Sequence, residues 1–268
     1  MNRTGIVWTL AGVSLASLVL AGPRAAAQDF QEQPTVLSSN GTTLRITRPG
    51  SYRLSRDLRL REDGAAVVIS ASGVSLNLAG HALTGPGGKI GTGILIEGVQ
   101  NVSVRNGTLQ GFGFGVRIVS AVNVKVQDLQ IAGEDGGGPP PGEVGILIFN
   151  SRGVEAFRNV ISRVFLGVFV RGGGSGGNRI AENTLAAGAA GQIGICYNPD
   201  GLDTAAGPRG DVIYNNLVSG FNIGIQTSAE SRGNIFREND LVFVQQAVQE
   251  LSPSGANELA GNTAISLN

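Results

Sequence analysis

The residues best suited to chemistry in this sequence lie in or beside two glycine-rich insertions, Gly172 to Gly177 and Asn198 to Gly210. Both insertions follow the first predicted strand of neighbouring repeats, so we expect them to lie side by side. Carboxylates serve as general acids or bases and as Ca²⁺ ligands, and guanidinium groups bind carboxylates. Four charged residues are therefore the catalytic candidates: Arg171, Asp200, Asp203 and Arg209. Ca²⁺ is the one cofactor that the carboxylates among them could hold.

Four further residues are candidates for holding a substrate: Tyr197, Asp211, Arg117 and Phe169. Tyr197 and Asp211 flank the second insertion, and a tyrosine can both stack on a sugar and hydrogen-bond to it. Arg117 and Phe169 fall at outward positions of predicted strands. The alternative interpretation is that the insertions are solvated loops, in which Asp and Pro residues simply make turns.

Charge and cysteine content exclude several classes of protein. Twenty basic and twenty acidic side chains give a net charge of +0, so we expect no basic surface for nucleic acid or for an anionic membrane. Cys196 is the one cysteine, which excludes an internal disulfide and cysteine-based metal sites, and we assign no metal site. His81 is the one histidine, and no motif for a serine–histidine–aspartate triad surrounds it.

The first 27 residues have the pattern of an export signal. Arg3 precedes an uncharged apolar run from Gly5 to Gly22, and three alanines end at Ala27. We expect a signal peptide at residues 1–27, cleaved after Ala27, and hence a periplasmic or secreted protein. The alternative is an uncleaved anchor, because the run is about long enough to span a membrane.

A short phrase, a small residue followed by apolar-x-apolar, recurs along the rest of the chain. Successive copies are spaced by 27, 22, 30, 22, 27, 30 and 23 residues, and Gly- or Pro-rich insertions such as Glu134 to Gly142 lengthen the repeat. Two further apolar segments follow each phrase, which predicts a solenoid of about eight coils with three short strands per coil. The phrases begin at Ala66, Gly93, Gly115, Gly145, Gly167, Gly194, Gly224 and Ala247.

Alternation along each phrase assigns inward and outward side chains. Pairs such as Ile94 and Ile96 are predicted to form the core, and the outward row is predicted to include an apolar stripe of Leu95, Leu147 and Phe169. Such a stripe could support self-association. A second register of amides predicts an asparagine ladder at a turn, with a structural role: Asn159, Asn183, Asn216, Asn239 and Asn262.

Three stretches resemble the opening coils of a known superfamily: Arg48 to Leu58 (RPGSYRLSRDL), Gly73 to Leu83 (GVSLNLAGHAL) and Asn101 to Gly111 (NVSVRNGTLQG). They are similar to exported bacterial right-handed β-helix repeat proteins of the pectate-lyase-like superfamily. The resemblance implies an all-β fold, a single-stranded right-handed parallel β-helix. We expect an N-terminal cap and first partial coil at residues 28–65, followed by the β-helix at residues 66–268.

The superfamily contains lyases, polygalacturonases, epimerases and phage tailspikes, so the resemblance does not specify a function. The outward rows contain no cluster of carboxylates, which favours a protein that binds or scaffolds on polysaccharide at the periplasm or cell exterior. The alternative is a polysaccharide lyase, C5-epimerase or glycoside hydrolase acting on a uronate-containing polymer. In both cases the expected partner is polysaccharide, without nucleic acid and without a membrane after signal cleavage.

Overall fold

The computed structural model describes residues 35–37, 43–134, 143–189, 191–198 and 207–266. These residues form 26 strands and no helix, so none of them belongs to a helix that could cross a membrane. The pairings between the described strands are parallel, and each joins one coil to the next. The all-β solenoid with three strands per coil is therefore confirmed.

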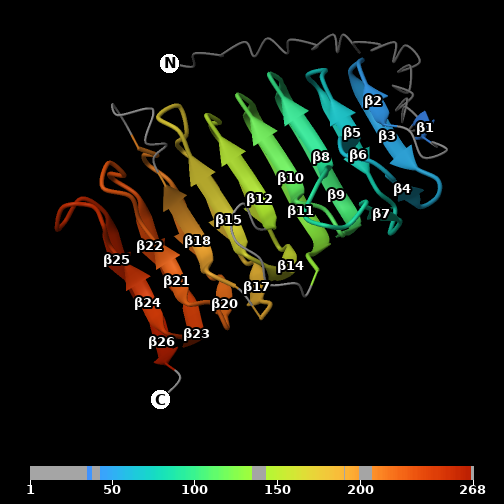
Figure 1. The fold of residues 1–268 in the computed structure, drawn as a ribbon. Helices are drawn as coiled ribbons and strands as arrows, with labels where there is room; N and C mark the ends of the chain where they lie inside the picture. Colours follow the sequence, from blue (N-terminus) through green and yellow to red (C-terminus); the bar gives the residue numbers. More distant parts are fainter. Residues whose placement is uncertain (1–34, 38–42, 135–142, 190, 199–206, 267–268) are drawn as a thin grey trace, which may run out of the picture. The chain divides into compact units, whose positions relative to one another are not determined.

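The first face of the solenoid is a sheet of nine described strands stacked in chain order, most of which can be followed from blue to red in Figure 1. These strands are β2 (Leu44–Ile46), β5 (Ala65–Ile69), β8 (Thr92–Glu97), β10 (Phe114–Val119), β12 (Val144–Phe149), β15 (Leu166–Arg171), β18 (Ile193–Asn198), β21 (Ile223–Gln226) and β24 (Gln246–Gln249).

The second and third faces form one continuous sheet, because β9 (Gln100–Gln110) and β11 (Val122–Ala132) run through both. The other strands of the second face are β1 (Thr35–Leu37), β3 (Gly50–Leu54), β6 (Val74–Asn77), β13 (Glu155–Phe157), β16 (Arg179–Ala181), β19 (Val212–Tyr214), β22 (Ile235–Arg237) and β25 (Glu258–Ala260). Those of the third face are β4 (Leu58–Arg59), β7 (Ala82–Thr84), β14 (Val160–Val164), β17 (Thr184–Ala187), β20 (Leu217–Ser219), β23 (Asp240–Val244) and β26 (Thr263–Ser266).

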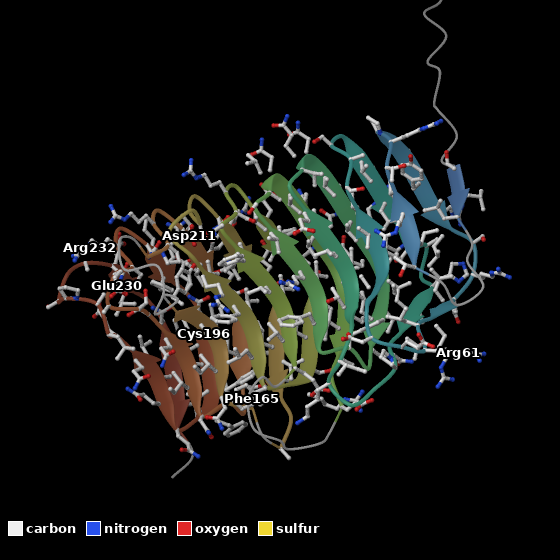
Figure 2. All side chains as sticks on the ribbon, turned by 45° about the horizontal axis from the view of Figure 1, so that its top comes forward. Arg61, Phe165, Cys196, Asp211, Glu230 and Arg232 are labelled. Carbon is white, nitrogen blue, oxygen red and sulfur yellow. The ribbon has the colours of Figure 1, made fainter. Side chains whose placement is uncertain are left out.

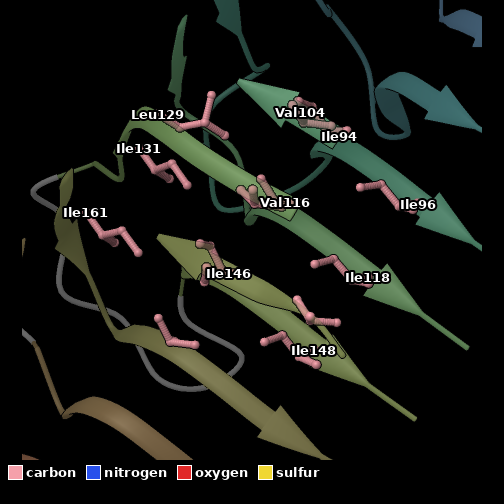
Figure 3. Close-up of a cluster of buried hydrophobic side chains, with 14 of the residues drawn as sticks. Ile94, Ile96, Val104, Val116, Ile118, Leu129, Ile131, Ile146, Ile148 and Ile161 are labelled. Atoms are coloured by element: carbon pink, nitrogen blue, oxygen red, sulfur yellow. The ribbon is translucent and has the colours of Figure 1, made fainter. Parts of the chain in front are cut away.

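The core consists of aliphatic side chains that stack on equivalent side chains of the next coil. Ile94 of β8 is in register with Val116 of β10, which is in register with Ile146 of β12. All three are fully buried, and Figure 3 shows them beside a parallel row that contains Ile96, Ile118 and Ile148. The predicted inward rows are therefore confirmed, and β-branched side chains suit them because they pack well on a pleated surface.

Glycines precede the inward residues of the first face because the third face packs closely against them. A Cβ added to Gly167 would lie 2.3 Å from Leu185 Cδ2 and 2.4 Å from the carbonyl oxygen of Gly194. Atoms at such distances overlap, so the backbone itself would have to move. The small residue that opens each phrase therefore sets the spacing between two faces of the coil.

We expect Gly167→Ala to lower the free energy of unfolding by about 2 kcal/mol, because it overpacks this contact. Denaturant unfolding would measure the change. In a Leu185→Val background the clashing Cδ2 atom is absent, so Gly167→Ala should cost less there. If the changes in the free energy of unfolding caused by the two substitutions simply add, the contact between Gly167 and Leu185 would be contradicted.

The predicted asparagine ladder is present at the turn between the second and third faces. The Nδ2 group of Asn159 donates to Asn183 Oδ1 at 3.0 Å, and Asn183 and Asn216 repeat this bond toward the next coil at 2.9 Å each. Asn239 continues the ladder to Asn262 at 2.9 Å. Each Oδ1 also accepts the backbone N–H of the preceding ladder residue, so the amides satisfy buried turn groups that would otherwise lack partners.

A second polar ladder, which sequence reasoning missed, lies at the turn between the first and second faces. It contains Asn178, Asp211, Asn234 and Asn257. The backbone N–H of Asn178 donates to Asp211 Oδ1 at 2.8 Å, and that of Asp211 donates to Asn234 Oδ1 at 3.0 Å. Asp211 is the one carboxylate among these four residues, so it lacks the Nδ2 donor that Asn234 offers to Asn257.

The outward row of the first face follows the predicted register, with Leu95, Arg117, Leu147 and Phe169 in line. Leu147 is only 5% exposed, and Leu95 and Phe169 are half-buried. The apolar stripe therefore offers less open surface than the sequence suggests, and self-association through it remains a prediction.

Candidate functional site

Two adjoining hollows lie where the third face turns back toward the first face, in the N-terminal coils. Their volumes are about 420 and 350 Å³, and both are lined by Arg59 and Pro86. We call this region the arginine trough. Its other lining residues are Leu60, Arg61, Thr84, Gly85, Gly87, Gln110, Gly111, Gly133, Glu134 and Arg163.

The floor of the arginine trough is bare backbone. Gly85, Gly111 and Gly133 lie at this turn on successive coils, and each donates its backbone N–H to a carbonyl oxygen of the next coil, those of Gln110, Ala132 and Ser162 respectively. A Cβ on Gly85 would lie 2.0 Å from the carbonyl oxygen of Gly111, and one on Gly133 would lie 2.1 Å from that of Arg163. The close approach of the coils therefore excludes a side chain at Gly85 and at Gly133, whereas a Cβ on Gly111 would lie at an ordinary contact distance, 3.5 Å from Glu134 Oε1.

Polar and cationic side chains border this floor. Arg59, Thr84 and Gln110 are in register on the third face, and Gln110 Nε2 donates to Thr84 Oγ1 at 3.2 Å. The side chains of Arg61, which is labelled in Figure 2, and of Arg163 are exposed at the rim. Guanidinium groups form bidentate hydrogen bonds with carboxylates, so the trough has the chemistry to hold an extended anionic ligand.

Glu134 lines the arginine trough, and the buried Glu143 is hydrogen-bonded to its backbone. Glu134 Oε2 accepts the backbone N–H of Gly88 at 3.0 Å, and the backbone N–H of Glu134 donates to Glu143 Oε1 at 2.6 Å. Glu143 is 3% exposed. Burial raises the pKa of Glu143, and the charge of Glu134 adds to this effect, while the Glu134 N–H, Lys89 and Arg163 oppose it. The pair therefore combines an exposed carboxyl group with a buried one that holds its proton more tightly.

Only part of the site predicted from the insertions can be followed. Asp200 and Asp203 lie outside the described residues. Arg209 is exposed and lines a hollow of about 400 Å³ with Arg152 and the glycines of the first insertion. The expected proximity of Arg209 to this insertion is therefore confirmed, whereas a catalytic role stays a prediction.

Tyr197 and Asp211 are fully buried inside the coil, which corrects the expectation that they line a substrate site. Tyr197 is in register with the inward residue Val170, and its hydroxyl donates to Asp211 Oδ2 at 2.9 Å. Burial raises the pKa of Asp211 to about 6. Burial and the neighbouring Asp211 charge raise the pKa of Tyr197 as well. The pair belongs to the second ladder rather than to a surface.

Arg117, Phe169 and Arg171 form an aromatic and cationic cluster on the first face. The Arg171 guanidinium carbon lies 5.5 Å from the ring centroid of Phe169 and 5.4 Å from that of Phe149. Arg117 lies in the same way over Phe114, at 5.6 Å. Burial, and then the charge of Arg117, lower the pKa of Arg171. The arginines therefore cover ring faces that a sugar would need for stacking.

The two single residues that the sequence left unassigned have packing roles. Cys196 is 2% exposed, and burial raises the pKa of its thiol to about 12, so the thiol is not a reactive nucleophile. His81 Nδ1 lies 3.1 Å from Asp57 Oδ1, and the same oxygen accepts the backbone N–H of Ala82. These contacts fix the turn between two coils.

The arginine trough carries little signal in the sequence. Arg163 is far from Arg59 and Arg61 in the chain, and the three arginines share no motif. The glycines Gly85, Gly111 and Gly133 recur at coil spacing, which was the one available signal. Across the part of the chain that the structure describes, no three His, Cys, Asp or Glu side chains are grouped to hold a metal ion.

Comparison with solved structures gives remote similarities. The Dettilon tailspike protein aligns at 15% identity and a TM-score of 0.47, over 85% of this chain and 52% of the tailspike, so the chain spans about half of that protein. An alginate lyase from Paenibacillus sp. str. FPU-7 aligns at 13% identity and a TM-score of 0.41, over 83% of this chain and 99% of the lyase.

No curated protein matches the sequence. A family model described as the right-handed β-helix region matches residues 66–264, which are the residues that form most of the stacked coils described above. The chain therefore belongs to the right-handed β-helix family.

Proposed function

We propose that this chain is an exported protein that binds an acidic polysaccharide in the arginine trough. The observation that carries the proposal is the strip of bare backbone across successive coils, bordered by Arg59, Arg61 and Arg163. A linear polymer can lie along such a strip beside Glu134, whose carboxylate occupies the part of the strip at Gly87 and Gly88. Export is supported by the charged start, apolar run and small residues within residues 1–27.

The chemistry of the rim favours a uronate over a neutral sugar. Guanidinium groups make charge-assisted hydrogen bonds to carboxylates, which are about twice as strong as neutral ones. Thr84 and Gln110 add neutral donors and acceptors for sugar hydroxyls. A polymer that carries both kinds of group would use the whole set.

We expect the double variant Arg59→Gln/Arg61→Gln to bind polygalacturonate or alginate at least about tenfold more weakly, since it removes two charge-assisted contacts. Isothermal titration calorimetry at low and moderate salt would measure this, and added salt should weaken wild-type binding because the rim is exposed.

Arg53→Gln is the matched control for this experiment. Arg53 is an exposed arginine of β3, one face away from Arg59 in the same coil. It should leave the affinity within about twofold, because exposed charges away from a site contribute little. Equal losses in the control and the double variant would mean that binding reflects general charge and not the trough.

An enzyme remains the second candidate, and one observation favours it. Glu134 lines the trough together with Arg163, and its backbone N–H donates to Glu143, whose pKa is raised by burial, so a carboxylate pair adjoins a cationic substrate-binding group. The same polysaccharides should therefore be incubated with the protein, with and without Ca²⁺, and followed for cleavage, unsaturated ends and epimer content. Turnover would establish an enzyme, whereas binding without turnover would favour a binding module.

A further inference from the structure

A column of arginines runs along the turn between the first and second faces. Isolated parallel bridges join Arg152 to Gly176, Gly176 to Arg209, and Arg209 to Arg232. Equivalent positions on successive coils thus carry arginine, glycine, arginine and arginine. Arg209 and Arg232 are direct neighbours in this column, and Arg152 lies one position beyond Gly176, so an anion that lies against the column would reduce the repulsion between like charges.

The glycine in this column leaves a hollow between two of the arginines. The hollow has a volume of about 400 Å³ and is lined by Arg152, Gly173, Gly174, Ser175, Gly176 and Arg209. We call it the corner hollow. A Cβ on Gly176 would lie 2.5 Å from the carbonyl oxygen of Arg209, so the fold itself keeps this position free of a side chain.

The walls of the corner hollow are held in place by hydrogen bonds. Arg152 Nε donates to the carbonyl oxygen of Gly174 at 3.1 Å, which fixes the guanidinium group over the glycine segment. The backbone N–H of Gly174 donates to Asn150 Oδ1 at 3.2 Å. Beneath them, Ser175 Oγ donates to the carbonyl oxygen of Arg171 at 2.7 Å. A site that is fixed before binding loses less entropy when a ligand enters.

The charge of the corner hollow is not balanced by the described residues that line it. None of its described lining residues is a carboxylate. Within the part of the chain that the structure describes, the ion pairs join His81, Lys125 and Arg158 to acidic residues, and none involves Arg152 or Arg209. The hollow is therefore a positively charged pocket with a neutral backbone floor.

We propose that the corner hollow binds a tetrahedral oxyanion, a sulfate or phosphate group, between Arg152 and Arg209. A tetrahedral group presents oxygens toward guanidinium groups on two opposite sides, whereas a carboxylate presents both oxygens along one edge. The group is either a free inorganic ion or an ester on a polymer. This site is independent of the arginine trough, which is lined by a different set of residues at another turn.

The test is calorimetric titration of the full chain with sodium sulfate and sodium phosphate, against sodium chloride at equal ionic strength. We expect saturable binding of sulfate or phosphate, weakened at least about tenfold by Arg152→Gln and by Arg209→Gln, since each removes a charge-assisted contact. Arg232→Gln is the matched control, because Arg232 is next in the column but does not line the hollow. It should change the affinity by no more than about twofold.

Three results would overturn the proposal: sulfate and phosphate that behave like chloride, an Arg209→Gln variant that titrates like the unmodified chain, or an equal loss with Arg232→Gln. Competition by dextran sulfate for the inorganic ion would identify an ester on a polymer as a ligand, and lack of competition would identify the free ion. Arg59→Gln/Arg61→Gln should leave sulfate binding unchanged, so failure of the trough proposal and failure of this one give different results.

Discussion

Replacement of Asn216 by alanine is expected to lower the free energy of unfolding by about 4 kcal/mol, because it leaves several buried polar groups without partners. Asn216 Nδ2 donates to the carbonyl oxygen of Ile180 and to Asn239 Oδ1, at 2.9 Å each. Its Oδ1 accepts both the backbone N–H and the Nδ2 group of Asn183. Alanine keeps none of these bonds, and the site is only 1% exposed, so water cannot replace them.

Denaturant unfolding of the full chain would measure this effect, with Asn262→Ala as the matched control. Asn262 is the last residue of the same ladder and is half-buried. Water can reach the groups that it leaves behind, so we expect less than half of the loss. Equal losses at both positions would show that burial does not determine how much a ladder residue contributes to the free energy of unfolding.

Asp211→Asn is expected to raise the stability at neutral pH by roughly 3 kcal/mol, because it removes a buried charge from the second ladder. The pKa of Asp211 is raised by burial from 3.8 to about 6 in the folded protein. The folded state therefore binds this proton more tightly than the unfolded chain does. The stability that the proton contributes is fully present below about pH 4 and is lost as the pH rises through about 6.

The measurement is the free energy of unfolding of the unmodified chain and of Asp211→Asn between about pH 4 and pH 8. The two curves should meet at the acid end and separate as the pH rises through about 6. Parallel curves would contradict the assignment of a raised pKa to Asp211. Other groups titrate in this range, but they are common to both proteins and cancel in the difference.

Tyr197→Phe gives an independent check on the same pair. The phenol hydrogen bond to Asp211 lowers the pKa of that carboxyl group, against the larger effect of burial. Without the hydroxyl, the pKa of Asp211 should move up. The pH at which stability is lost should then rise, whereas a purely steric effect of the substitution would not shift it.

The architecture could be predicted from the sequence because each level of structure repeats. The phrase that begins at Gly93 and Gly115 encodes both the close packing of two faces and the inward row that follows. The ladder at Asn159 could be found by counting, because the amides keep a constant offset from the second strand. Repetition makes such features visible without knowledge of the fold.

The candidate binding surface was harder to predict because it does not repeat. The arginine trough depends on Arg59 and Arg163, which are brought together only by the stacking of coils. The position of Asp211 after an insertion predicts a surface residue, although Asp211 occupies a buried ladder position. Tyr197 could have been placed correctly, since alternation from the inward Ile195 makes Tyr197 inward as well.

The stacking of parallel coils also limits how long a ligand the arginine trough can recognise. Equivalent atoms on successive coils repeat at the strand spacing of about 4.8 Å. A polymer whose own repeat differs from this period falls out of phase after a few units, and its later groups then face the wrong coil positions. Affinity should therefore increase with oligomer length only up to the point of mismatch. Beyond that length, a longer chain should gain affinity only because it offers more equivalent positions at which binding can start.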